Sequence, residues 1–136
     1  MSLYKEILLD HYKHPRHHGT VTNPNFTVTE FNPLCGDLIQ ISGVTCPAKP
    51  LATLGYESRN LLEAKFRGKG CVISQATASI LLEKYVGKSA NEILAITPDD
   101  ILALIQMELG PNRIKCALLP LIALQNGIKS KESGTC

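Results

Sequence analysis

The chain has 136 residues, of which 44% are hydrophobic and 19% are charged, so it can bury the core of one domain. Its net charge is only +2, and it contains no tryptophan. A charge excess this small does not indicate a nucleic-acid partner, and an aromatic fraction of 5% offers few surfaces on which bases could stack.

No segment of the sequence is apolar enough to predict a membrane span. The longest apolar run, residues 117–124, is interrupted by Pro120, whereas a spanning helix needs about 18 apolar residues or more. The first six residues carry charge where a signal peptide would be apolar, and no small-residue cleavage site follows. We therefore expect a cytoplasmic protein with no membrane partner.

The first third of the chain predicts a helix followed by two strands. Apolar residues recur at helical spacing within 2–13, and polar and apolar residues alternate within 26–32 and 37–44. Proline and glycine mark turns at 14–19 and 32–37.

A long connection and a third strand come next. Residues 45–60 contain two prolines and a glycine, which predict a loop long enough to be functional. Residues 61–67 alternate again, and Leu62, Ala64 and Phe66 are expected on the buried side of this strand.

The remainder of the chain predicts helices. Their expected ranges are 72–86, a short helix after the capping box 89–92, a helix from Thr97 to about 109, and 116–128, followed by a polar tail from about 129. Strands grouped before helices are typical of an α+β fold, so we expect one α+β domain spanning residues 1–136.

Five cysteines raise the question of function: Cys35, Cys46, Cys71, Cys116 and Cys136. An odd number of cysteines in a cytoplasmic chain does not indicate a disulfide framework. Three of them lie at junctions between the predicted elements. Cys35 is in the turn between the first two strands, Cys71 follows the third strand, and Cys116 precedes the last helix. Side chains at such junctions can converge on one surface.

The surroundings of these thiols favour the thiolate form, which binds metals and attacks sulfur. Cys71 and Cys116 are expected at helix N-termini, where the helix dipole stabilises an anion, and Lys69 and Lys115 flank them. Arg113 is also close in sequence to Cys116.

Asp37 adds a carboxylate to the turn that carries Cys35. Three cysteines and one aspartate form a ligand set suited to Zn²⁺ or to the iron of a cluster. Because the chain has no Cys-x-x-Cys pair, the residues alone leave inert buried thiols as an open alternative. The histidines His11, His14, His17 and His18 are expected on a solvated or partner-binding surface.

Several segments resemble one known family, the iron–sulfur cluster assembly scaffolds of the IscU, SufU and NifU N-terminal type. The matching segments are Asn32-Pro-Leu-Cys-Gly-Asp37, the glycine-rich stretch 68–79, Arg113-Ile-Lys-Cys116 and the opening residues 4–19. Taken in this order, the combination is highly specific and covers nearly the whole chain.

The resemblance implies a compact α+β fold with a three-stranded antiparallel sheet, and a site formed by Cys35, Asp37, Cys71 and Cys116. Members of the family receive sulfur from a cysteine desulfurase, assemble a [2Fe–2S] cluster and transfer it to apo iron–sulfur acceptor proteins. Many of them also bind Zn²⁺ at the same place.

The residues before Cys116 decide which branch of the family the chain resembles. The IscU branch has histidine directly before this cysteine, whereas this chain has Lys115, as SufU proteins do. Some SufU proteins hold zinc and accept persulfide sulfur from the desulfurase. The resemblance therefore implies a second hypothesis, in which Cys116 is the sulfur acceptor and Lys115 and Arg113 assist it.

Two other departures from the family patterns concern partners and loop length. The Leu-Pro-Pro-Val-Lys segment by which IscU proteins bind a dedicated Hsp70 chaperone is replaced by Leu109-Gly-Pro-Asn-Arg113. Binding of such a chaperone is therefore doubtful. The spacing of Cys35 and Cys71 indicates extra residues within 45–60, which we hypothesise to lie over the site. A small zinc-stabilised interaction domain without chemistry is a third interpretation.

Overall fold

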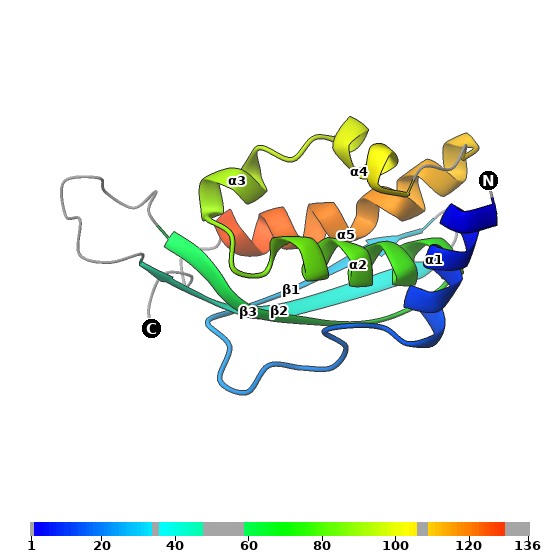
Figure 1. The fold of residues 1–136 in the computed structure, drawn as a ribbon. Helices are drawn as coiled ribbons and strands as arrows, with labels where there is room; N and C mark the ends of the chain where they lie inside the picture. The colour runs from blue at the N-terminus through cyan, green and yellow to red at the C-terminus, as the bar shows by residue number, and fades with distance from the viewer. Residues whose placement is uncertain (1, 34–35, 48–58, 106–108, 130–136) are drawn as a thin grey trace.

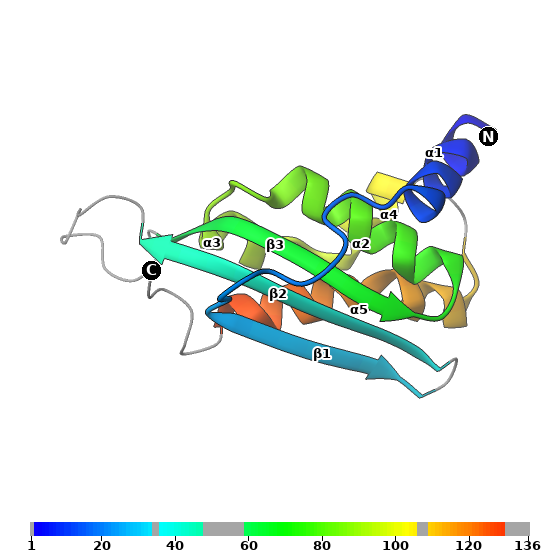
Figure 2. The same cartoon turned by 90° about the horizontal axis from the view of Figure 1, so that it is seen from below.

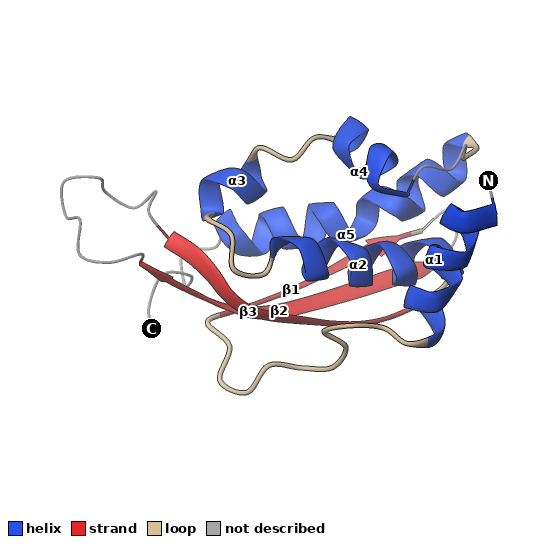
Figure 3. Ribbon diagram, viewed as in Figure 1, coloured by secondary structure: helices blue, strands red, loops and turns tan. Residues whose placement is uncertain are grey.

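The computed structural model describes residues 2–33, 36–47, 59–105 and 109–129. Its elements follow in the order α1 (Ser2–Lys13), β1 (Phe26–Asn32), β2 (Asp37–Pro47), β3 (Arg59–Lys69), α2 (Val72–Tyr85), α3 (Ala90–Leu94), α4 (Pro98–Ile105) and α5 (Pro111–Lys129). The strands form one antiparallel sheet in the order β1-β2-β3, and helices α2 and α5 cover one of its faces (Figures 1 and 3). The predicted α+β fold is confirmed.

The register of the sheet brings two distant segments to the same end. Asn32 pairs with Asp37 where β1 turns into β2, and Leu38 pairs with Lys69 at the end of β3. The start of β2 therefore lies beside the end of β3, and α2 begins only three residues after Lys69. Any side chains at these two junctions are neighbours.

A β-bulge changes which residues of β3 are buried. Val44 pairs with Glu63, but the next residue, Thr45, pairs with Leu61, so Leu62 is the extra residue of the bulge. Leu61 is fully buried, and Leu62 is 54% exposed. The prediction that Leu62 faces the core was wrong, because strict alternation holds only between Glu63 and Lys69.

Strands β2 and β3 extend further than the sequence pattern predicted. Residues 45–47 and 59–60, expected within the long connection, are strand. Residues 48–58 are not among those described. The strand ends that flank them, Pro47 and Arg59, lie at the opposite end of the sheet from Asp37.

The helical half of the chain follows the predicted order, and the largest shift of a boundary is at the start of the last helix. Helix α5 begins at Pro111 rather than at Cys116. The first N–H group of a helix has no partner within the helix, so proline, which lacks this group and already has a helical φ, is favoured at this position. The predicted caps at Ser89 and Thr97 are confirmed, since Ser89 Oγ accepts from the Glu92 N–H and Thr97 Oγ1 from the Asp100 N–H, both at 3.2 Å. At Thr97 the reciprocal bond of a capping box also forms, because the Thr97 N–H donates to Asp100 Oδ2 at 2.9 Å.

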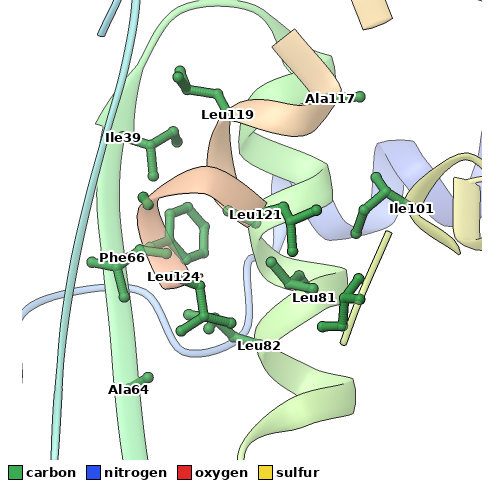
Figure 4. Close-up of a cluster of buried hydrophobic side chains, with 14 of the residues drawn as sticks. Ile39, Ala64, Phe66, Leu81, Leu82, Ile101, Ala117, Leu119, Leu121 and Leu124 are labelled. Carbon is green, nitrogen blue, oxygen red and sulfur yellow. The ribbon is translucent and has the colours of Figure 1, made fainter. Parts of the chain in front are cut away.

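The hydrophobic core lies between the sheet and the helices (Figure 4). Ile39 and Phe66 contribute from the sheet, and Leu81, Leu82 and Leu124 from helices α2 and α5, each with no accessible surface. The packing of these side chains fixes α2 and α5 on the sheet, and with them every residue carried near their N-termini.

The segment between α1 and β1 crosses the other face of the sheet (Figure 2). It first pairs with the edge of β3, where the Gly19 N–H donates to the Phe66 carbonyl and the Phe66 N–H donates to the His17 carbonyl, both at 2.8 Å. Further on, the Val21 N–H donates to Ser42 Oγ of β2 at 3.0 Å. This segment is therefore held against the sheet at several points.

Helix α1 is anchored to α2 through one buried hydroxyl group. Ser79 Oγ lies 2.7 Å from His11 Nδ1 and accepts a hydrogen bond from the Arg16 N–H at 2.8 Å. His11 Nε2 also lies 3.5 Å from a carboxylate oxygen of Glu83. The expectation that His11 is a surface histidine was wrong, because the ring is turned into the helix interface and the side chain is only 9% exposed.

Among the described residues, no helix is long and apolar enough to cross a membrane.

The burial of His11 predicts a pH dependence of stability. Burial is the main cause that lowers the pKa of His11 below its ordinary value of 6.5; Arg16 acts in the same direction, while Glu83 and Asp10 oppose it. The unfolded chain therefore takes up this proton first as the pH falls, so the free energy of unfolding decreases below about pH 6.5.

Urea unfolding at about pH 7.5 and about pH 5.5 checks this prediction. We expect a smaller pH-dependent loss of stability in His11→Gln than in the unchanged chain. His14→Gln, which replaces an exposed histidine one turn later, is the matched control and should keep the full loss. Equal losses in all three proteins would contradict the assignment to His11.

Candidate metal centre

Three of the predicted site residues meet at one end of the sheet. Asp37 is the first residue of β2, Cys71 directly precedes α2, and Cys116 lies in the second turn of α5. One carboxylate oxygen and the two sulfur atoms all lie within 4.8 Å of one another. Residues from three separate segments thus present three metal-binding atoms to one point.

Asp37 is held by two hydrogen bonds from Cys71. The Cys71 N–H donates to Asp37 Oδ1 at 3.0 Å, and the Cys71 thiol donates to Asp37 Oδ2 at 3.1 Å. Asp37 is almost completely buried, with 1% of the surface of the residue exposed. A buried carboxylate needs such partners, because burial without them is strongly unfavourable.

Gly70 makes this contact possible. Its φ of +133° is a conformation that residues with a Cβ rarely adopt, and a Cβ built there would overlap the Asp37 carboxylate. The sequence pattern indicated an open backbone near the thiols, but not that Gly70 packs directly on Asp37. The only indication of this packing in the sequence was the glycine that immediately precedes Cys71.

The two cysteines differ in their relation to helix termini. Cys71 is the N-cap of α2 with extended backbone angles, as expected, although its side chain bonds to Asp37 rather than to the helix backbone. The expectation that Cys116 lies at a helix N-terminus was wrong, because α5 begins five residues earlier, at Pro111. The helix dipole acts mainly within the first turn, so of the two cysteines only Cys71 lies close enough to a helix N-terminus to be affected by it.

The cysteines also differ in exposure. Cys71 is partly exposed, whereas Cys116 is 3% exposed and packs within the hydrophobic core. Neither is in a disulfide. A reactant arriving from solvent therefore meets Cys71 first.

The donor atoms fit a metal of intermediate softness. Thiolate and carboxylate groups are ligands of Zn²⁺ and of iron, and four such donors complete a tetrahedral site. Asp37, Cys71 and Cys116 supply three donors. Cys35, the predicted fourth ligand, lies outside the described residues. The set also contains none of the four histidines among the described residues.

The remaining predicted site residues are less closely connected. Lys115 and Arg113 are exposed on α5, and neither side chain has a hydrogen bond or ion pair within the described part of the chain. Arg113 lies three residues before Cys116, which places both on one side of the helix. Cys46 is paired with Asn60 in the sheet, and Cys136 lies outside the described residues. The roles of Lys115 and Arg113 stay predictions.

Comparisons with known proteins agree on one family. The sequence profile of the NifU-like N terminal domain matches residues 3–134. The zinc-dependent sulfurtransferase SufU of Bacillus subtilis (strain 168) is 33% identical, over 98% of this chain and 94% of the relative. The iron-sulfur cluster assembly scaffold protein IscU of Streptococcus pyogenes serotype M1 is 32% identical, over 93% of this chain and 83% of the relative.

A solved structure supports the same fold. The crystal structure of a hypothetical protein superposes with a TM-score of 0.72 at 28% identity, covering 95% of this chain and 98% of that chain.

The contact of Gly70 with Asp37 predicts that Gly70→Ala disturbs the metal centre. Because a Cβ overlaps the carboxylate, we expect the affinity for Co²⁺ to fall about tenfold or more, as when a residue supporting a metal ligand is lost. The visible absorption of thiolate-bound Co²⁺ measures this affinity.

Gly87→Ala is the matched control. Gly87 also has a positive φ, of +97°, but a Cβ there meets nothing within 4 Å. Both variants should lose stability, by about 1–3 kcal/mol from backbone strain, and only Gly70→Ala should lose Co²⁺ affinity. Equal affinities in the two variants would contradict the proposed contact.

Proposed function

Because this chain belongs to the NifU-like N-terminal domain family, we propose that it is an iron–sulfur cluster assembly scaffold. It receives sulfur from a cysteine desulfurase and assembles a [2Fe–2S] cluster on Cys35, Asp37, Cys71 and Cys116. It then transfers the cluster to apo iron–sulfur acceptor proteins.

One observation carries this proposal: two thiols and a carboxylate from three segments lie within 4.8 Å of one another at one end of the sheet. A scaffold needs thiolates to hold iron and a way to release its product, and a partly exposed site at the end of a sheet serves both needs.

Iron and sulfide are the substrates of this chemistry, and the protein supplies ligands. The Cys71 thiol must lose its proton before its sulfur can bind iron, and this proton is the one now donated to Asp37 Oδ2. Loading the site therefore breaks the Cys71–Asp37 side-chain bond and releases a proton. The backbone bond from the Cys71 N–H to Asp37 Oδ1 can keep the carboxylate in position.

Asp37 is the ligand that we expect to make the cluster transferable. A carboxylate oxygen is a harder ligand than a thiolate and binds iron of a sulfide cluster less strongly. We therefore predict that Asp37→Ala gives a longer-lived cluster after anaerobic reconstitution, measured by the decay of its visible absorption.

Asp99→Ala, which removes an exposed carboxylate from the first turn of α4, is the control and should leave the lifetime unchanged. A cluster on Asp37→Ala that decays as fast as on the unchanged chain would count against a labile Asp37.

The alternative is a zinc-dependent sulfur relay, and one comparison favours it. The relative from Bacillus subtilis, which is 33% identical over nearly the full length, is named a zinc-dependent sulfurtransferase. The donor set of sulfur and carboxylate oxygen suits Zn²⁺ equally well. When bound, Zn²⁺ would hold the cysteines as thiolates until sulfur arrives.

In this relay, the Cys116 thiolate attacks the terminal sulfur of the desulfurase persulfide. A new sulfur–sulfur bond forms on Cys116, the persulfide bond on the desulfurase breaks, and the desulfurase cysteine leaves as a thiolate. Lys115 and Arg113 would stabilise the Cys116 thiolate by their charge. Because Cys116 is 3% exposed, its sulfur must become accessible before this attack.

The relay predicts that Cys116→Ser no longer stimulates the activity of the desulfurase and no longer acquires a persulfide. Mass spectrometry of this chain after the reaction measures the persulfide. Cys71→Ser is the comparison variant, because it removes a thiol from the same centre at a more exposed position. A persulfide retained on Cys116→Ser and lost from Cys71→Ser would transfer the acceptor role to Cys71.

The decisive experiment is anaerobic reconstitution with iron, cysteine and a desulfurase. A cluster chromophore that moves to an apo-ferredoxin supports the scaffold. Retained zinc with a persulfide and no chromophore supports the relay. If chelation of metal only unfolds the chain, neither holds and the zinc-stabilised interaction domain is favoured.

The remaining expectations about partners and location stay part of this proposal. Free thiols persist in the reducing cytoplasm, where we propose that the chain acts. We propose no dedicated Hsp70 partner, since the chain has Leu109-Gly-Pro-Asn-Arg113 in place of the chaperone-binding segment.

A further inference from the structure

Two adjoining hollows lie beside the end of β3, outside the metal centre. One has a volume of about 380 Å³ and is lined by His18, Leu38, Gln40, Arg67, Gly68 and Lys69. The other, of about 300 Å³, shares His18, Gly68 and Lys69 with it and adds Tyr12, Pro15, Gly70 and Gln75. We call the two together the basic groove.

The walls of the groove are held in place by the fold. Arg67 and Lys69 are two residues apart on β3 and therefore lie on the same face of the sheet. This face is opposite to that of the fully buried Phe66, and so it faces away from α2 and α5. His18 is fixed opposite them, because its neighbours His17 and Gly19 are hydrogen-bonded to Phe66 and its ring packs edge-on against the Phe66 ring. The groove is thus formed without any partner.

The charge of the groove has one sign. None of the lining residues is acidic, and the exposed Arg67 and Lys69 form no ion pair with any described residue. Asp37 is buried and lines neither hollow. Cations that converge on a concave surface without a carboxylate create a positive potential there.

A buried donor inside the groove independently indicates a ligand. The side-chain nitrogen of Gln75 is inaccessible to solvent and has no hydrogen-bond partner among the described residues. Buried polar groups nearly always have such a partner, so this one is explained by a group that the chain itself does not supply. Because Gln75 lines the second hollow, rotation of its side chain can bring this nitrogen to an acceptor bound there.

We propose that the basic groove binds a small oxyanion, the carboxylate or phosphate group of a small molecule. The Arg67 guanidinium and the Lys69 ammonium bind its charge, and Gln75 and the His18 ring donate further hydrogen bonds. Hollows of this size admit a small organic molecule rather than a single ion. The groove contains no cysteine, so this proposal does not depend on the proposed function of the metal centre.

Titration of the metal-free chain with sodium phosphate and with sodium malonate tests the proposal, with sodium chloride at equal ionic strength as reference. We expect saturable shifts in the NMR spectrum at the backbone amides of Gly68 and Lys69 and at the side-chain amide of Gln75. Saturation by phosphate alone, by malonate alone or by both identifies the preferred oxyanion.

Three variants of β3 decide whether the groove is responsible. Arg67→Gln and Lys69→Gln should each weaken binding about fivefold or more, since each loses a charge-assisted hydrogen bond. Lys65→Gln is the matched control: it removes the same charge from the same face of the strand, yet Lys65 lines neither hollow. Its affinity should change less than about twofold.

Two results would overturn the proposal. One is the absence of saturable shifts beyond those caused by chloride. The other is an equal loss of affinity in all three variants, which would mean that the affinity for the anion depends on the net charge of the protein rather than on the groove. Both are measured on metal-free protein, so neither bears on cluster assembly or sulfur transfer.

Discussion

Two hydrogen bonds from Cys71 to Asp37 join segments 34 residues apart and define the geometry of the metal centre. They require that the start of β2 lie beside the end of β3, which the register of the sheet provides. They also require a residue without a Cβ at position 70. Cys116 then completes the group, because the packing of α5 on the sheet brings its second turn to the same point.

The unequal exposure of the two thiols shapes both proposed activities. A partly exposed Cys71 beside a buried Asp37 and a buried Cys116 gives the centre an open side and a closed side. Iron or sulfur entering from solvent meets the open side first, and the buried ligands exclude water behind it. A scaffold can use this asymmetry directly. A relay through Cys116 must first expose that sulfur, and this is the main physical difference between the two mechanisms.

Most of the fold could be predicted from residue patterns, and the structure brings together three of the four predicted ligands. Periodicity and capping residues located the helices, and the resemblance to a family named Asp37, Cys71 and Cys116. Leu62 could not be placed, because a bulge reverses alternation without a local signal. His11 could not be placed either, because its partner Ser79 is 68 residues away. The start of α5 was predicted too late, because Pro111 begins this helix, and α5 continues through Pro120.

The attachment of α1 to Ser79 has a consequence for synthesis on the ribosome. The first helix to emerge cannot dock until α2 has been made, since Ser79 and Glu83, the two partners of its buried His11, both lie on that helix. The donors of the metal centre also emerge in the order 37, 71 and 116, with the last one on the final helix. A nascent chain that ends before Pro111 therefore lacks Cys116, and cannot complete the proposed set of ligands around a metal ion.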